Sequence, residues 1–173
     1  MGETIYNLAF DFGASSGRMI LSKYADGKIE LEELHRFSND PVSIGGTLYW
    51  DVLRQFYEIK QGIVKAKQFG PIDSIAIDTW GMDFGLIAKD GTLLENPVHY
   101  RDLRTTGLVE KSFSKIPKEE FYHLTGNQFM ELNTVFQLYS LALNRPYQLE
   151  RADCLLLMPD LFNYMLTGVK ASD

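Results

Sequence analysis

Apolar and polar residues alternate at the start of the chain in the manner of β-strands. Residues 5–12 and 18–24 are apolar runs separated by a turn of small residues, and residues 29–37 alternate apolar positions with glutamates. The dipeptide Asp26-Gly27 between the second and third runs is the strongest short signal for a hairpin. The pattern therefore predicts three antiparallel strands joined by tight turns, the third with one face toward solvent.

The next segment changes to helical spacing. After a loop at residues 39–46 and a short extended piece at 47–50, apolar residues recur three and four positions apart up to Val64. Asp51 is the predicted N-cap of this helix, and Gly70 followed by proline is predicted to end it. Residues 72–78 then have the composition of a buried strand.

The second half of the chain is predicted to be mostly helical. A strand at 84–88 precedes an irregular polar stretch at 96–104. The remaining predicted elements are helices at 105–113, 117–124, 134–143 and 146–151, a strand at 154–158 and a helix at 159–166. Three antiparallel strands, a helix, a parallel strand and further helices are typical of an α/β protein with the ribonuclease H-like core of the actin-like ATPases, whose sheet is mixed.

Composition narrows the class of protein. The 173 residues are 45% hydrophobic with a net charge of −6, which predicts a soluble globular chain and argues against nucleic acid as a partner. Cys154 is the only cysteine, so an intrachain disulfide and a cysteine-based zinc site are excluded. There is no leader pattern at the start and no apolar run of membrane-spanning length, so we expect a cytoplasmic protein without a membrane partner.

The turn between the first two strands carries the first candidate chemistry. Asp11 ends the first strand, two glycines and two serines follow, and Arg18 opens the second strand. Small side chains leave backbone amides uncovered, so the turn can form a concave nest for a phosphate. Asp11 is placed to hold a metal ion, and the planar fork of Arg18 suits phosphate oxygens. The alternative is an ordinary glycine hairpin with an exposed aspartate.

The same turn also matches the Gly-x-Ser-x-Gly elbow of the α/β hydrolases, with Ser15 as the nucleophile. That elbow leads into a helix, whereas residues 18–24 have the pattern of a strand. Hydrolase chemistry is therefore the less favoured hypothesis. The turn is not a Walker A loop either, because no Gly-Lys-Ser/Thr follows Gly13 at the right distance.

A second group of candidates lies between the strands at 72–78 and 84–88. An indole such as Trp80 packs on the C–H face of a sugar, Gly81 offers bare backbone, and the carboxylate of Asp83 accepts hydrogen bonds from hydroxyl groups. The alternative is a tight turn with a buried tryptophan.

Two further polar segments have simple structural interpretations. The polar stretch at 99–105 is by itself most simply a salt-bridged surface loop, and Asn133 is favoured as a helix cap.

Taken together, these motifs resemble the FGGY carbohydrate kinases. The matching pieces occur in family order over essentially the whole chain, and they include AFDFGASSGRMIL, DSIAIDTWGMDFGLI, HYRDLRTTGL and LLLMPDLFNYMLTG. Within the family, the combination of GASSGR, IDTWGMDFG and HYRDLRT is similar to the members that phosphorylate L-rhamnulose.

The resemblance implies transfer of the γ-phosphate of ATP, bound with Mg²⁺, to O1 of L-rhamnulose, giving L-rhamnulose 1-phosphate. It implies that Asp11 lies beside the metal. The ATP-phosphate loop would consist of Ala14, Ser15, Ser16, Gly17 and Arg18, and the sugar site would use Trp80, Gly81, Asp83, Tyr100 and Arg101. The alternatives are another FGGY ketose or polyol kinase, and a non-catalytic actin-like module that binds nucleotide.

The chain departs from the family in extent. Family members are much longer, carry a second actin-like domain that holds the adenine, and use as catalytic base an aspartate in a His-Asp-Thr context that is absent here. The resemblance therefore implies that residues 1–173 are an incomplete N-terminal kinase domain on the sugar and phosphate side. No catalytic residue is expected within them, the partner is the C-terminal domain of the same protein, and we expect the chain alone to be inactive.

Overall fold

The computed structural model describes residues 4–172, and the chain divides into two compact units. Unit 1 comprises Met1–Pro41, Asp51–Gly81 and Met158–Asp173, and unit 2 comprises Val42–Trp50 and Met82–Leu157. Each unit is therefore assembled from segments that are far apart in the sequence.

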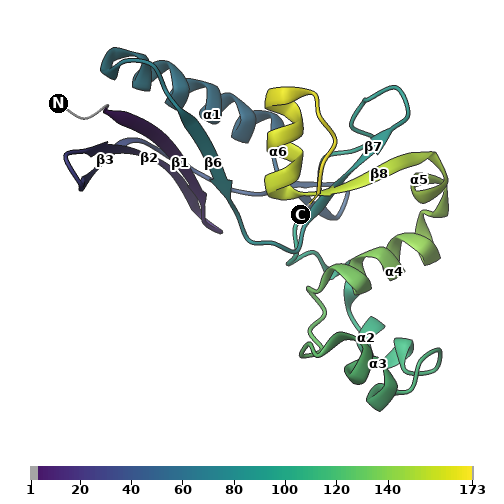
Figure 1. The fold of residues 1–173 in the computed structure, drawn as a ribbon. Helices are drawn as coiled ribbons and strands as arrows, with labels where there is room; N and C mark the ends of the chain where they lie inside the picture. The colour runs from purple at the N-terminus through teal and green to yellow at the C-terminus, as the bar shows by residue number, and fades with distance from the viewer. Residues whose placement is uncertain (1–3, 173) are drawn as a thin grey trace. The chain divides into compact units, whose positions relative to one another are not determined.

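Unit 1 contains a mixed sheet with strand order β3-β2-β1-β6 (Figure 1). Its strands are β1 (Ile5–Phe12), β2 (Ser16–Ala25), β3 (Lys28–Ser38) and β6 (Ser74–Asp78). The first three are antiparallel neighbours, and β6 pairs with β1 in parallel. This arrangement confirms the predicted three-stranded antiparallel start and the parallel strand that follows the helix.

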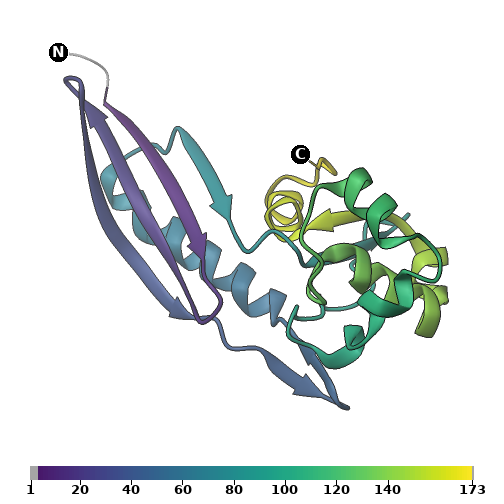
Figure 2. The same ribbon diagram turned by 90° about the horizontal axis from the view of Figure 1, so that it is seen from below.

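Helix α1 (Val52–Ala66), extended by the short helix η1 (Lys67–Phe69), covers one face of this sheet (Figures 1 and 2). Its start is capped as predicted, because the side chain of Asp51 accepts a hydrogen bond of 3.1 Å from the amide of Arg54. The buried side chains of β1, β2 and α1 form the core beneath it; they include Leu8, Phe10, Met19, Leu21 and Ile59.

Helix and sheet approach each other closely at Gly62. A Cβ atom at this position would lie 2.9 Å from the ring of Phe10 and 3.0 Å from the sulfur of Met19. The glycine therefore allows the helix backbone to rest directly on the core side chains of β1 and β2.

The prediction of a buried strand at 72–78 is right about the strand but wrong about its burial. Four of the five residues of β6 are exposed, and only Ile77 is half-buried. Within residues 4–172, β6 pairs only with β1 and so stands at an edge of the sheet. The last helix of unit 1, α6 (Met158–Thr167), packs near it, with the ring of Phe162 stacked on Phe12 at 5.0 Å.

Unit 2 contains two small antiparallel sheets and a group of helices. One sheet is the hairpin of β4 (Val42–Ile44) and β5 (Thr47–Tyr49), and the other pairs β7 (Phe84–Ala88) with β8 (Ala152–Leu157). The helical segments are η2 (Leu103–Thr105), α2 (Leu108–Ser112), α3 (Lys118–Thr125), α4 (Thr134–Asn144) and α5 (Pro146–Arg151).

Two predictions for unit 2 are corrected by the structure. The expected loop at 39–46 contains β4, and the helix expected at 105–113 begins only at Leu108. The helix is shortened because Gly107 has a φ of 74°, in the left-handed region, and interrupts it after η2. No helix in the described part of the chain is long and apolar enough to cross a membrane.

Candidate functional site

The turn between β1 and β2 is anchored by its carbonyl groups. The amide of Gly13 donates to the carbonyl oxygen of Ser16 at 2.9 Å, and Asn39 donates through its backbone to Ser15 (3.0 Å) and through its side chain to Gly13 (2.8 Å). Within residues 4–172, the exposed amides of Ala14 and Ser15 take part in no hydrogen bond. Two backbone donors are therefore available to an anion.

The glycines of this turn serve packing. None of residues 13–17 has a positive φ, so the backbone lacks the alternating conformation of a nest. A Cβ atom on Gly17 would lie 2.2 Å from the ring of Phe37, which shows that the ring of the neighbouring strand requires a glycine there. Since Ser16 begins a strand, the turn also lacks the helix of a hydrolase elbow.

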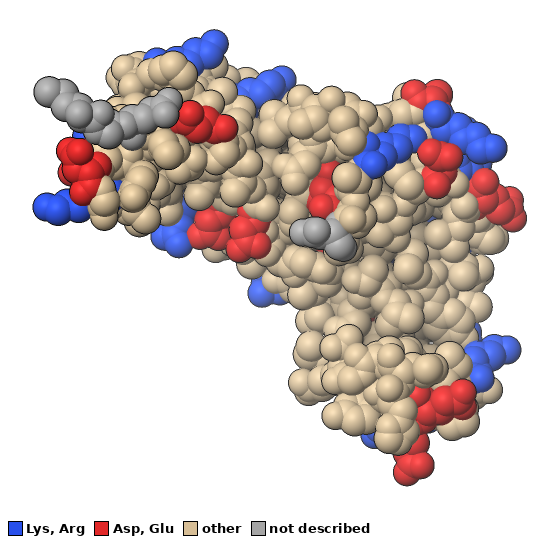
Figure 3. All heavy atoms as spheres, in the orientation of Figure 1, with Lys and Arg blue, Asp and Glu red and all other residues tan. Residues whose placement is uncertain are grey.

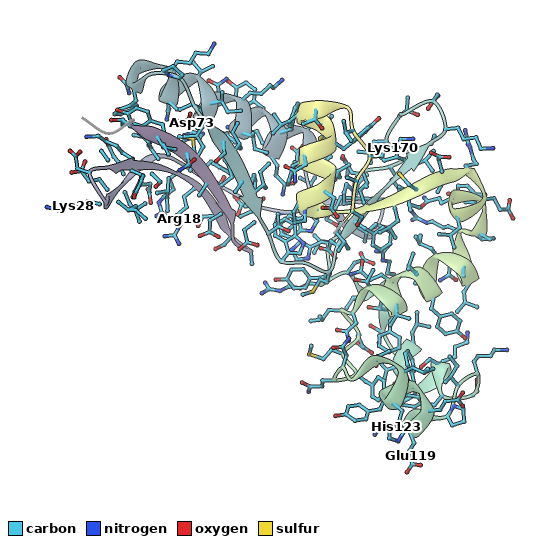
Figure 4. All side chains as sticks on the ribbon, viewed as in Figure 1. Arg18, Lys28, Asp73, Glu119, His123 and Lys170 are labelled. Carbon is cyan, nitrogen blue, oxygen red and sulfur yellow. The ribbon has the colours of Figure 1, made fainter. Side chains whose placement is uncertain are left out.

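A row of charged side chains crosses the open face of the sheet beside this turn. Asp11 pairs in register with Arg18 on β2 and with Asp78 on β6, and Arg18 pairs in register with Arg36 on β3. Residues paired in this way share one face of a sheet. Figure 4 shows Arg18 projecting from the side of the sheet opposite α1, and Figure 3 shows acidic and basic side chains interspersed on the viewed face.

Asp11 and Arg18 form an ion pair. The Oδ2 atom of Asp11 lies 2.7 Å from Nη2 and 2.9 Å from Nε of Arg18, and both side chains are nearly half exposed. The residue predicted to hold a metal and the residue predicted to hold phosphate are thus held next to each other, in contact with solvent.

The carboxylates of Asp11 and Asp78 decide whether a magnesium ion fits here. In the described part of the chain, no group of three or more histidine, cysteine, aspartate or glutamate side chains could hold a metal. Mg²⁺ bound together with phosphates, however, commonly uses only one or two carboxylates and keeps several waters. Two carboxylates at the carboxyl ends of neighbouring parallel strands satisfy this requirement. Asp78 was not among the predicted residues, although it ends an apolar strand just as Asp11 does.

The turn after β6 presents bare backbone. Gly81 has a φ of 66°, which glycine adopts most readily. Apart from Gly81 and its two chain neighbours, no described residue has a heavy atom within 4 Å of where a Cβ atom would lie. Trp80 beside it is half-buried. The surroundings of Gly81 within unit 1 are therefore open to a ligand.

Asp83 differs from the prediction, because its side chain has no exposed surface. Its Oδ2 atom accepts hydrogen bonds from Trp50 Nε1 (2.6 Å) and from the amide of Tyr100 (3.0 Å), and its Oδ1 atom accepts one from Gln137 Nε2 (2.8 Å). In this structure the carboxylate is an internal acceptor that joins three segments of unit 2, and it offers no free surface to a sugar.

Gln137 extends this buried network to Arg104. The Nε2 atom of Gln137 also lies 2.9 Å from the carbonyl oxygen of Leu132, and its Oε1 atom accepts a hydrogen bond of 2.7 Å from Arg104 Nη2. Burial lowers the pKa of Arg104, an effect that the charge of Asp102 opposes. Sequence reasoning missed Gln137; the available signal was a glutamine among the apolar residues of a helix.

Asn133 takes the predicted cap position, but its side chain donates instead to the carbonyl oxygen of Gln128.

An aromatic stack leads from this network to the surface. The rings of Trp50 and His99 lie 4.0 Å apart and those of His99 and Tyr100 lie 4.5 Å apart, while the guanidinium of Arg101 lies 5.3 Å from the Tyr100 ring. Burial, aided by the charge of Arg101, lowers the pKa of His99 to about 4. The His99 ring is therefore neutral at pH 7, and Nδ1 accepts a hydrogen bond from the amide of Arg101. Tyr100 is half-buried and Arg101 is exposed.

Similar proteins give these groups a context. Curated relatives include rhamnulokinases from Bacteroides thetaiotaomicron, 47% identical over 92% of this chain and 33% of the relative, and from Oceanobacillus iheyensis, 44% identical over 96% of this chain and 36% of the relative. The chain thus spans about a third of the length of these relatives.

Solved structures with similar folds include a gluconate kinase and a ligand-bound xylulose kinase, both from Lactobacillus acidophilus. The TM-scores are 0.83 and 0.81, over 97% and 95% of this chain and 34% of each of those chains. At 17% and 18% identity they establish the fold alone, and they confirm the predicted actin-like α/β class. The model of the N-terminal domain of the FGGY family of carbohydrate kinases matches residues 6–173. The chain therefore belongs to the FGGY family of carbohydrate kinases.

Proposed function

We propose that this chain supplies the phosphate-binding part and some of the sugar-binding part of a cytoplasmic kinase that transfers the γ-phosphate of ATP to L-rhamnulose, giving L-rhamnulose 1-phosphate. The observation that carries the proposal is the solvent-accessible pair of Asp11 and Arg18 beside the free amides of the β1–β2 turn. Identity of 47% to a rhamnulokinase supports the choice of sugar.

On the phosphate side, the donors of the turn receive the phosphate oxygens of ATP. The amides of Ala14 and Ser15 point to this role because they have no partner within residues 4–172. Arg18 exchanges the carboxylate of Asp11 for phosphate oxygens, which its planar fork matches. Asp11 and Asp78 would hold Mg²⁺, which supplies charge neutralisation for the phosphates. Ser16 and Gly17 complete the loop.

On the sugar side, the exposed residues make the contacts and the buried ones hold them in place. Gly81 offers open backbone, and Trp80, Tyr100 and Arg101 offer aromatic and charged surface. Asp83 acts as a positioning residue, because its hydrogen bond to the amide of Tyr100 fixes the loop that carries Tyr100. The general base lies outside residues 1–173 in this proposal, since the chain contains no His-Asp-Thr sequence.

The experiment is a chimera in which this chain replaces the corresponding third of the Bacteroides thetaiotaomicron rhamnulokinase. ADP formation is measured with L-rhamnulose, L-fuculose and xylulose. We expect turnover with L-rhamnulose, and a loss of about 100-fold or more in kcat/KM for Arg18→Gln, because a charged donor to the phosphates is removed. Lys23→Gln, at a half-buried position of the same strand, is the matched control and should change little.

The alternatives give different results in this chimera. Preference for xylulose or L-fuculose would identify another FGGY ketose kinase. Nucleotide binding without turnover on any sugar would favour a non-catalytic module. Activity that survives Arg18→Gln unchanged would contradict the assigned role of the turn.

A further inference from the structure

Arg104 carries a positive charge that no carboxylate in the described part of the chain pairs with directly. Its guanidinium makes one hydrogen bond there, to the neutral side chain of Gln137 at 2.7 Å, and it takes part in none of the ion pairs found within residues 4–172. Arg104 is half-buried. A guanidinium has five N–H donors, and taking a charge out of water is costly unless the charge is paired. The remaining donors therefore favour an anionic partner.

Arg104 lines a cavity of about 150 Å³ in unit 2. Its lining is largely polar and includes Thr47, Asp102, Arg104, Ser140, Asn144 and Arg145. A cavity that holds a single water needs a volume of roughly 10–15 Å³, so this cavity has room for a molecule larger than water.

Two arginines, Arg104 and Arg145, and one carboxylate, that of Asp102, line the cavity. Both oxygens of Asp102 already accept backbone hydrogen bonds, from Leu48 at 2.7 Å and from Arg104 at 2.9 Å. Arg145 is paired with Glu95, at 3.0 and 3.2 Å. Burial raises the pKa of Glu95, but hydrogen bonds from Tyr49 and Gln148 and the charge of Arg145 outweigh it and hold the pKa below its ordinary value. Within residues 4–172, Arg104 is thus the lining cation with no carboxylate at ion-pair distance, and the charges of Asp102, Asp83 and Glu95 act on it from farther away.

We propose that this cavity binds a small oxyanion, either phosphate or the phosphoryl group of a phosphorylated sugar, with Arg104 as its principal ligand. Arginine is well suited to phosphate because its N–H groups match two oxygens at once. Asn144 adds an amide to the lining, whereas the hydroxyl of Ser140 already donates to the carbonyl oxygen of Arg104 at 3.0 Å and accepts from Asn144 at 3.4 Å. The proposal concerns unit 2 alone and does not depend on the kinase function proposed above.

The test is a titration of the ¹⁵N-labelled 173-residue chain with sodium phosphate, followed by NMR at constant ionic strength with chloride as the reference salt. We expect saturable shifts that cluster at the amides of Thr47, Asp102 and Asn144. Arg104→Gln should weaken binding at least about tenfold, because the charge-assisted hydrogen bonds to the anion are lost.

A second variant keeps the test valid if Arg104→Gln disturbs the fold. Asn144 is exposed at the cavity, so Asn144→Asp adds a negative charge there with almost no change in volume. It should weaken phosphate binding about tenfold, whereas Asn144→Lys should strengthen it. Lys89→Gln, in an exposed turn of the same unit, removes a positive charge elsewhere and should leave binding unchanged.

Shifts that are absent, that spread over the surface lysines, or that persist unchanged in Asn144→Asp would overturn the proposal. A parallel titration with fructose 1-phosphate separates the two sources of the anion. Tighter binding than phosphate assigns the site to a phosphorylated sugar, and equal or weaker binding assigns it to free phosphate. No arm measures enzyme activity, so failure here leaves the proposed kinase function standing.

Discussion

At the scale of single residues, three donors from three segments converge on the carboxylate of Asp83. Asp83→Asn keeps the shape of the side chain but places an amide where acceptors are needed, so at least one donor loses its partner inside the protein. We expect the free energy of unfolding, measured in urea, to be about 2–4 kcal/mol lower for Asp83→Asn than for the parent chain. Asp40→Asn, at an exposed position, is the control. A loss below about 0.5 kcal/mol for Asp83→Asn would show that the network contributes little to stability.

His99 predicts a pH dependence of stability. Its pKa is about 4 in the folded chain against an ordinary value of 6.5, so below pH 6.5 the unfolded chain takes up a proton that the folded chain does not. The stabilisation is complete above pH 6.5 and is lost progressively as the pH falls toward 4. Urea midpoints measured between pH 7 and pH 4.5 should decrease in the parent chain.

The control for this effect is His99→Gln, which removes the titrating ring. Carboxyl groups ordinarily titrate near 4.5, so they contribute little between pH 6.5 and 5. Between pH 6.5 and 5, the urea midpoint should therefore change clearly less with pH in His99→Gln than in the parent chain. Parallel slopes in the two proteins would mean that His99 does not control the stability there.

Part of the candidate site could be predicted from these residues, and part could not. Asp11 and Arg18 stand on either side of a short turn, so local sequence was enough to place them together. The burial of Asp83 depends on Trp50, Tyr100 and Gln137, which lie 17 to 54 positions away in the sequence, and no local pattern reports such partners. Asp78 depends in the same way on the register between β6 and β1.

At the scale of elements, the contact between α1 and the sheet rests on Gly62. On the surface of a helix, alanine stabilises the helix by about 1 kcal/mol relative to glycine. At position 62, however, the added methyl group would meet Phe10 and Met19 at about 3 Å. We expect Gly62→Ala to destabilise unit 1 by about 1–3 kcal/mol through overpacking. Val64→Ala, at an exposed position of the same helix, should stay within about 0.5 kcal/mol in the same denaturation experiment. Stabilisation by Gly62→Ala would show that the core yields to the added methyl.

Most elements followed from the sequence because their signals are local. Periodicity placed α1, α4 and α5 closely, and the Asp-Gly turn placed the hairpin of β2 and β3. The errors come from longer-range effects. The burial of β6 depends on which strands adjoin it. Within residues 4–172, β4 pairs only with β5, and its three residues are too few for a pattern of their own.

At the scale of the whole molecule, the chain spans about a third of the length of the rhamnulokinases it resembles. Phosphoryl transfer needs the nucleotide, the acceptor hydroxyl and a base held together. We expect the 173-residue chain alone to show no phosphorylation of L-rhamnulose above a mock preparation in a coupled assay, while the chimera described above is active. Turnover by the isolated chain would contradict this and would require a base within residues 1–173.

The division into two units also sets the order in which the chain can fold during its synthesis. Unit 2 is complete once residue 157 has left the ribosome, whereas unit 1 lacks α6 until the residues after it have been made. The aromatic contact between Phe12 and Phe162 joins one of the first strands to the last helix. The strands that carry Asp11 and Arg18 therefore lack one of their packing partners until α6 has been made.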